Sequence, residues 1–259
     1  MLMRMKRKTT TTPRARDSSI RSRAYLHIQQ LIASGSLAAG SGISELDLAK
    51  ELGSSRTPIR EAMNQLAAEG LLRLSPGGGM VVAHLTREDI VELYELREAL
   101  ETYAVCKIAN ATMHPAAKQQ LQQLVDEILI LRQELIKSKR KRLSERQMER
   151  FIGCDLGFHA LLIGMAKNSR LQKIINDTRL LISIFAIHRI GHDADALKEI
   201  HHYHQKILDA VLKQNGQVAM SFLAQHIQAS RNERLNEYDH WKRESTLQQS
   251  IPAFFDIHR

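Results

Sequence analysis

One carboxylate and three imidazoles stand where a plain helical bundle would carry apolar side chains. Asp155 and His159 lie four positions apart, so in a helix they share one face that is otherwise apolar. His204 and His226 fall within the apolar stripes of two later expected helices. Burying these groups without partners would cost on the order of several kcal/mol, and a divalent metal ion removes that cost because carboxylate and neutral imidazoles are its ligands. The spacing predicts a metal site of Asp155, His159, His204 and His226, with zinc favoured and nickel or manganese also suitable.

An ordinary structural role for these histidines is the alternative. The chain has twelve histidines, and because most of them lie after residue 158, some meet an apolar stripe by chance. Each histidine taken alone is better explained as an ordinary core or surface residue. The pairing of Asp155 with His159 makes a metal-binding role as well supported as that ordinary role. A small error in helix phase would exchange His204 for His201 or His202, which are otherwise expected beside the site or on the surface.

Residues 43–73 predict a helix-turn-helix. Ser44 can cap a first helix that ends at Gly53, where a left-handed backbone costs little. A second helix follows, with Thr57 as its cap and Pro58 in its first position. Two helices joined by a Gly-containing turn match the motif that places the start of its second helix in the major groove of DNA.

Three polar residues share the exposed side of that second helix. Arg56, Arg60 and Asn64 stand four positions apart, so all three can face DNA together. Two short β-type runs on either side of residues 76–79 then predict a hairpin, the wing of a winged helix. The turn contains Gly78 and no bulky side chain, so its backbone can approach DNA closely. A pair of bundle helices with solvated arginines is the alternative, and the wing makes it the weaker one.

With the wing included, residues from about 24 to 84 resemble the winged-helix domain of the GntR family, especially its FadR branch. The resemblance is carried by the first helix of the motif, by the run 55–62 at the start of the second and by the Gly-rich wing. It implies base contacts from Arg56 and Arg60 and phosphate contacts from Ser55 and Thr57.

Long helical periodicity with little β signal follows the wing. It predicts six helices, near 86–110, 115–138, 142–166, 169–189, 193–214 and 217–239. The motifs around the four metal-site candidates resemble the FCD effector-binding domain of FadR-type regulators. In metal-binding members of that family, an aspartate and three histidines at the matched positions hold a divalent ion inside an all-helical bundle. Arg97 also matches the family pattern, and its guanidinium could bind an effector carboxylate or pair with Glu101 one turn later.

The charge of the chain is concentrated at its N-terminus. Of the net charge of +9, residues 1–23 hold eight basic side chains against one acid, whereas residues 24–85 hold four basic side chains against five acids. The expected DNA-binding domain is therefore close to neutral in charge. Its few arginines must contribute through where they are placed against DNA and not through a large positive charge. The basic arm is expected to be disordered without DNA and to supply salt-sensitive attraction to phosphates.

The motifs and the helical periodicity predict a mostly α protein, with an N-terminal winged helix-turn-helix followed by an all-α antiparallel helical bundle, and the length leaves room for both domains. The expected divisions are a basic arm over 1–23, the DNA-binding domain over 24–85, the effector-binding and dimerisation domain over 86–240 and a tail over 241–259. The longest apolar run is too short to cross a membrane, the charged N-terminus has no secretory signal, and two cysteines do not suggest a disulfide framework. A soluble cytoplasmic protein is expected.

These features predict a homodimeric transcription regulator that reads a near-palindromic double-stranded DNA operator. A small organic acid is the expected effector, bound at the metal beside Arg97. A sensor in which the ion itself is the signal is the alternative. A metal-dependent enzyme is less favoured, because no Glu or Asp is expected beside the cluster as a general base, and no catalytic residue is predicted.

Overall fold

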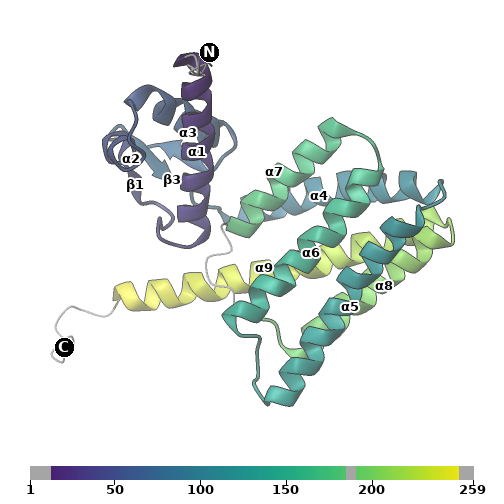
Figure 1. Cartoon of the computed structure of the whole chain (residues 1–259). Coiled ribbons are helices and arrows are strands. Elements are labelled where there is room, and N and C mark those ends of the chain that lie inside the picture. The colour runs from purple at the N-terminus through teal and green to yellow at the C-terminus, as the bar shows by residue number, and fades with distance from the viewer. Residues whose placement is uncertain (1–12, 185–190, 251–259) are drawn as a thin grey trace, which may run out of the picture. The chain divides into compact units, whose positions relative to one another are not determined.

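The computed structural model describes residues 13–184 and 191–250, and the chain divides into two compact units (Figure 1). The chain passes from the first unit into the second between His84 and Leu85. Both are built mainly from helices, and only the first contains a sheet in the described ranges, so the predicted mostly α fold class is confirmed.

The first unit holds a winged helix-turn-helix. Its helices are α1 (Pro13–Ala33), α2 (Glu45–Glu51) and α3 (Arg56–Ala68). The strands β1 (Gly42–Ile43), β2 (Leu72–Leu74) and β3 (Met80–Val82) form an antiparallel sheet in the order β1-β3-β2. Leu72 pairs with Val82 and Leu74 with Met80, so the β2–β3 hairpin is the predicted wing.

Local sequence explains how α2 and α3 meet. The Ser44 side chain accepts a hydrogen bond from the backbone N–H of Asp47 at 3.2 Å and so caps α2. Gly53 follows with φ +61°, a left-handed conformation that turns the chain sharply at little cost. Ile59 and Leu66 on the inner face of α3 are fully buried, and α3 packs against α1. Packing of this apolar face leaves the opposite side of α3 exposed.

The first unit differs from the sequence prediction at three points. The chain is already helical at Pro13, so residues 13–23, expected as a disordered arm, begin α1. The N-cap of α3 is Ser55 and not Thr57, because the extended backbone ends at Ser55 and helical geometry begins at Arg56. Strand β1 was not expected, because a strand of two residues has no measurable periodicity.

The second unit is a bundle of long helices, for which Figure 1 shows the arrangement. In chain order they are α4 (Arg87–Ala109), α5 (Pro115–Ser138), α6 (Glu145–Met165), α7 (Ser169–Ile184), α8 (Ala194–Leu212) and α9 (Gly216–Ser250). Helix α4 packs against α9 and α6, and α8 packs against α4, α5 and α9. Phe158, Leu121 and Ile175 lie fully buried between them.

Four of the six predicted helices begin and end within a few residues of the prediction, and α7 begins at the predicted Ser169. Thr86 and Asp89 form a capping box at the start of α4. The exception is α9, which continues to Ser250, so the first half of the expected tail over 241–259 is helical. Residues 185–190, predicted to end the helix 169–189, and residues 251–259 lie outside the described ranges. Within the residues that are described, no helix combines the length and apolarity needed to cross a membrane.

Candidate metal centre and DNA-reading surface

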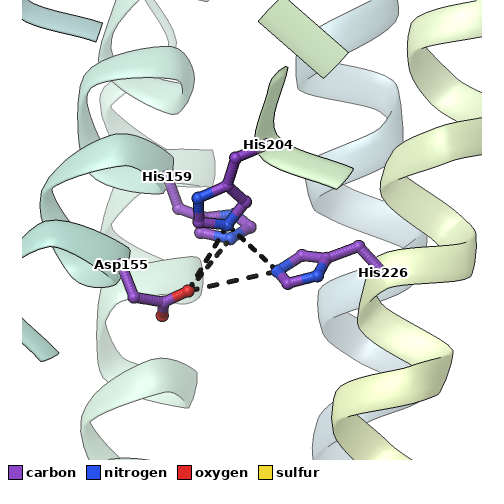
Figure 2. A group of neighbouring side chains, drawn as sticks. All are labelled: Asp155, His159, His204 and His226. Atoms are coloured by element: carbon purple, nitrogen blue, oxygen red, sulfur yellow. Dashed lines mark hydrogen bonds and ion pairs between the residues drawn. The ribbon is translucent and has the colours of Figure 1, made fainter. Parts of the chain in front are cut away.

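Four side chains from three helices of the second unit converge on one point, as Figure 2 shows. Asp155 and His159 lie on α6, His204 on α8 and His226 on α9. One ligand atom from each lies within 4.8 Å of the others. Asp155 Oδ1 is 3.5 Å from Nε2 of His204, 3.8 Å from Nε2 of His159 and 4.0 Å from Nε2 of His226. The structure thus brings together all four residues that the sequence singled out.

The shortest separations in the cluster are close to those that a single small ion requires. A metal with ligands at about 2.1 Å in a tetrahedral arrangement sets neighbouring ligand atoms about 3.4 Å apart. Nε2 of His204 and Nε2 of His226 are 3.2 Å apart, close to that value. Nε2 of His159 is buried and has no hydrogen-bond partner in the described part of the chain. A buried nitrogen without a partner is costly, and a metal ion would supply that partner.

The site is enclosed on its histidine side and open at Asp155. The side chains of His159, His204 and His226 are 1%, 0% and 4% exposed, whereas that of Asp155 is 24% exposed. Phe158 stacks on the His204 ring with centroids 4.2 Å apart, which fixes the ring plane. An ion or a small ligand would therefore reach the imidazoles past Asp155.

A buried carboxylate orients His159. Nδ1 of His159 lies 2.8 Å from Oε2 of Glu101 on α4, which is 1% exposed. An ionised carboxylate only accepts hydrogen bonds, so Nδ1 carries the proton and Nε2 presents its lone pair to the cluster. Glu101 also accepts a hydrogen bond from Nε of Arg97 at 2.8 Å. Of the two roles considered for Arg97, the structure shows the pair with Glu101.

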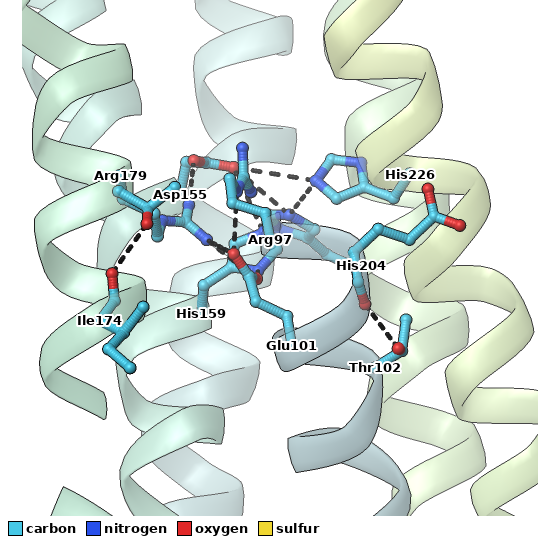
Figure 3. Close-up of polar contacts among 11 residues, drawn as sticks. Arg97, Glu101, Thr102, Asp155, His159, Ile174, Arg179, His204 and His226 are labelled. Atoms are coloured by element: carbon cyan, nitrogen blue, oxygen red, sulfur yellow. Dashed lines mark hydrogen bonds and ion pairs between the residues drawn. The ribbon is translucent and has the colours of Figure 1, made fainter. Parts of the chain in front are cut away.

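Arg179 on α7 links the two carboxylates of the site, as Figure 3 shows. Its Nη2 donates to Asp155 Oδ2 at 3.0 Å, and its Nη1 lies 3.2 Å from Glu101 Oε2. Arg179 holds one oxygen of Asp155 and leaves Oδ1 facing the imidazoles. Asp155 is thereby oriented as a one-oxygen ligand.

The electrostatics of the pocket favour charged acids and neutral histidines. Burial by itself raises the pKa of Asp155, but the hydrogen bond with His204 and the charges of His159 and Arg179 lower that pKa well below its usual range. Glu101 behaves likewise, since Arg97 and Arg179 outweigh burial and lower its pKa. Burial and the Arg179 charge lower the pKa of His159 to about 4. Burial also lowers the pKa of His226 well below its usual range. At neutral pH His159 and His226 are therefore neutral, which is the form that binds a metal.

Sequence reasoning missed Arg179 and treated Glu101 only as a partner of Arg97. Arg179 is four residues after the buried Ile175 and three before the buried Ile182. The spacing therefore puts this arginine on the apolar face of its helix, and that position could have indicated a buried, paired charge. A carboxylate that the sequence did not place beside the cluster lies there, because Glu101 touches His159. Its three partners and lowered pKa make it a poor general base.

The structure also separates the neighbouring histidines on α8. His204 is fully buried and belongs to the cluster, whereas His201 is half-buried and His202 exposed. Neither of the latter two belongs to the group of possible metal ligands found among the described residues.

The predicted DNA-reading residues of the first unit are all exposed to solvent. Those on α3 and its cap are all exposed: Ser55, Arg56, Thr57, Arg60 and Asn64. Gly78 is exposed in the turn of the wing, with φ +83° and nothing within 4 Å of where a Cβ would stand. The surface therefore presents its polar side chains and wing backbone to solvent. The sequence did not predict that Glu45 on α2 contacts both Arg56 and Arg60.

A winged helix joined to an all-helical domain with an interior cluster of polar residues defines a two-domain DNA-binding regulator. Residues 20–82 match the family of bacterial regulatory proteins named gntR, and residues 92–229 match the FCD domain. The chain belongs to the GntR family, in the FadR-like arrangement of a winged helix followed by an FCD domain. FCD domains commonly bind metals.

Relatives of similar architecture are transcription regulators. The chain is 28% identical over 202 residues to the uncharacterized HTH-type transcriptional regulator YdhC of Bacillus subtilis, covering 78% of this chain and 85% of that protein. It is 28% identical to a probable D-xylose utilization operon repressor of Paenarthrobacter nicotinovorans, covering 85% and 90%. It is 27% identical to the gluconate operon repressor of Bacillus licheniformis, covering 72% and 70%.

Solved structures share the fold. The E. coli protein McbR/YncC superposes with a TM-score of 0.65 at 21% identity, covering 85% of this chain and 98% of that one. A GntR regulator from Rhodococcus sp. RHA1 gives a TM-score of 0.64 at 21% identity, covering 84% and 98%.

Proposed function

We propose that this GntR-family regulator binds its operator under the control of a small carboxylate metabolite held at a divalent metal ion. The observation that carries the proposal is the convergence of Asp155 Oδ1 and three imidazole Nε2 atoms within 4.8 Å. Burying four such polar groups in the core of a bundle costs free energy unless a shared ligand compensates them. The family match makes DNA binding the output of the protein.

Asp155, His159, His204 and His226 would hold the ion, with zinc favoured and nickel or manganese also suited to the ligands. With a coordination number above four, the ion would keep open positions that oxygen atoms of an organic acid could fill, and it would act on them as a Lewis acid. Arg179 and Glu101 fix the orientation of the protein ligands through the contacts described above. Access past the partly exposed Asp155 suits a small anion.

Arg97 is the proposed partner of the effector carboxylate. It is 6% exposed, and its contact with Glu101 uses Nε alone. Its two terminal nitrogens therefore retain donors for a carboxylate, which a guanidinium binds with two parallel hydrogen bonds. The relatives named as gluconate operon repressors support an organic acid, since gluconate is a small carboxylate.

On the DNA side, Arg56 and Arg60 are proposed to contact bases, with Asn64 beside them on the same face of α3. Ser55 and Thr57 are proposed to contact phosphates, and the wing backbone at Gly78 a neighbouring groove or phosphate. A homodimer would place two such surfaces on the half-sites of a near-palindromic operator. Repression is the proposed sense of control, in line with the named relatives.

Effector control follows if metal and carboxylate bind one arrangement of the dimer better than another. To test this, the purified protein is analysed for bound metal and for co-purified acids by elemental analysis and native mass spectrometry, and an operator duplex is selected from a randomised library. Gluconate and other small acids are then titrated into the complex with and without zinc. An acid that shifts operator affinity only with metal present supports the proposal, and no shift with any acid contradicts it.

A metal sensor is the second candidate, because four protein ligands alone complete a tetrahedral zinc site. In that case zinc without any acid changes operator affinity. The same titration therefore distinguishes the two functions.

A further inference from the structure

The first turn of α2 brings a carboxylate against both arginines of the proposed DNA-reading surface. Oε1 and Oε2 of Glu45 accept hydrogen bonds from Nε and Nη2 of Arg60 at 2.9 and 2.8 Å. Oε2 also accepts one from Nη2 of Arg56 at 3.1 Å. The Glu45 side chain is 22% exposed, and those of Arg56 and Arg60 are 59% and 55% exposed. Glu45 thus lies behind two guanidinium groups that face solvent.

The pairing leaves one edge of Arg60 available. A guanidinium offers two edges that can each donate two parallel hydrogen bonds. Glu45 occupies the Nε–Nη2 edge, and Nη1 of Arg60 has no partner among the residues that the structure covers. The remaining Nη1–Nη2 edge matches the O6 and N7 acceptors of guanine, the commonest specific contact of an arginine. Fixing the first edge fixes the direction in which the second points.

The carboxylate also lowers the attraction of this surface for phosphates. Exposed arginines bind any DNA through the charge of the backbone, and that attraction carries no sequence information. A glutamate between them offsets part of their charge and repels phosphate oxygens. The oriented arginine donors strengthen binding to base acceptors in the major groove, but they add little to binding of the DNA phosphate backbone. The near-neutral balance of residues 24–85, with four basic and five acidic side chains, is consistent with this design.

We propose that Glu45 is a specificity-determining residue of the DNA-reading surface. It positions Arg60 and Arg56 for base contact and weakens their sequence-independent attraction to phosphate. The inference rests on the proposed role of these arginines in reading DNA, so the test includes a variant that checks that role separately.

The test compares two duplexes of equal length, one selected from a randomised library by the full-length protein and one with the same bases scrambled. In Glu45→Gln we expect affinity for the scrambled duplex to rise about threefold and the ratio of selected to scrambled affinity to fall about tenfold. We also expect affinity for the scrambled duplex to fall more steeply with salt, because more arginine charge meets phosphate. Asp47→Asn is the matched control, since it removes an exposed acid from the same turn of α2. It should leave the ratio within about twofold of wild type.

Glu45→Asp separates position from charge. It keeps the negative charge but shortens the reach to Arg60, so the ratio should fall without any rise in affinity for the scrambled duplex. Base-by-base substitution of the selected duplex should show the loss at the pair that Arg60 contacts, an effect that general weakening of the fold would not produce. Thermal unfolding confirms that each variant is folded.

Arg60→Ala distinguishes the two ways in which the idea can fail. If Arg60→Ala still prefers the selected duplex as wild type does, the proposed reading role of Arg60 is wrong. If Arg60→Ala loses the preference while Glu45→Gln keeps it unchanged, the reading role stands and the role of Glu45 is overturned.

Discussion

Glu101 and His159 form a buried pair that fixes which nitrogen of the imidazole faces the metal-site candidates. Oε2 of Glu101 is 2.8 Å from Nδ1 of His159, and both side chains are almost fully buried. The proton therefore lies on Nδ1, and the Nε2 lone pair faces Asp155. Glu101 also pairs with Arg97 and Arg179, so one carboxylate connects the proposed effector contact with the proposed metal ligands.

Replacing Glu101 by glutamine should weaken metal binding. The amide can no longer stabilise the Nδ1–H tautomer with a full negative charge, and such outer contacts change metal affinity by about 10- to 100-fold. Zinc affinity is measured by competition with a chromophoric chelator. Glu95→Gln is the control, since Glu95 is exposed on the same helix. Equal zinc affinity in the two variants would contradict the positioning role of Glu101.

Replacing Arg179 by methionine should destabilise the metal-free protein by about 3–5 kcal/mol, the cost of leaving a buried charge without its partner. Asp155 and Glu101 both lose a hydrogen-bonded cation in this variant. Zinc should recover part of the loss, because the ion compensates Asp155. Urea unfolding with and without zinc measures both effects.

Arg170→Met is the control for that variant, since Arg170 is exposed near the start of α7. It should change the free energy of unfolding by less than about 0.5 kcal/mol. Similar losses in both variants would show that Arg179 does not compensate the buried carboxylates.

The metal-free protein should lose stability as the pH falls from about 6.5 to 4. Burial and the Arg179 charge lower the pKa of His159 from 6.5 to about 4, so between these values the unfolded chain binds a proton that the folded chain does not. Stability is then fully present above pH 6.5 and declines toward pH 4, by about 3 kcal/mol for this one group at 1.4 kcal/mol per pH unit.

Urea unfolding at several pH values measures that slope, and chelator is present throughout. His159→Asn should flatten the slope, whereas His202→Asn, which changes an exposed residue on α8, should leave it unchanged. A slope that survives His159→Asn would assign the effect to other groups.

The sequence was sufficient for the four clustered residues because each interrupts a regular apolar stripe. A helical period indicates which positions share a face, so spacing places Asp155, His159 and His226 on the inward faces of their helices. It places His204 there too, but within a phase error that would admit His201 or His202. The same period located the helices of the second unit to within a few residues. The exception, α9, continues through a polar segment after Tyr238 that has no apolar stripe to reveal it.

The contacts of Arg179 and Glu45 could not be predicted in the same way. A period gives the face of a helix but not which residue of another helix stands opposite, and arginine and glutamate on a surface are usually solvated. Glu45 meets Arg60 across 15 positions in sequence, and Arg179 meets Glu101 across 78. Such pairs depend on how helices pack, which the spacing within one helix does not encode.

Replacing His204 and His226 together by asparagine should abolish effector response while sparing DNA binding. Both residues lie in the second unit and supply two of the four proposed ligands, whereas the proposed DNA-reading residues lie in the first unit. Operator affinity without ligand should stay within about threefold of wild type, a difference of less than about 0.7 kcal/mol. Fluorescence anisotropy of a labelled operator, titrated with zinc and small acids, measures both properties. A double variant at the exposed His202 and His240 controls for the loss of two imidazoles. A normal ligand response without His204 and His226 would exclude this cluster as the effector site, and loss of DNA binding in the folded variant would show that the cluster supports the DNA-binding state itself.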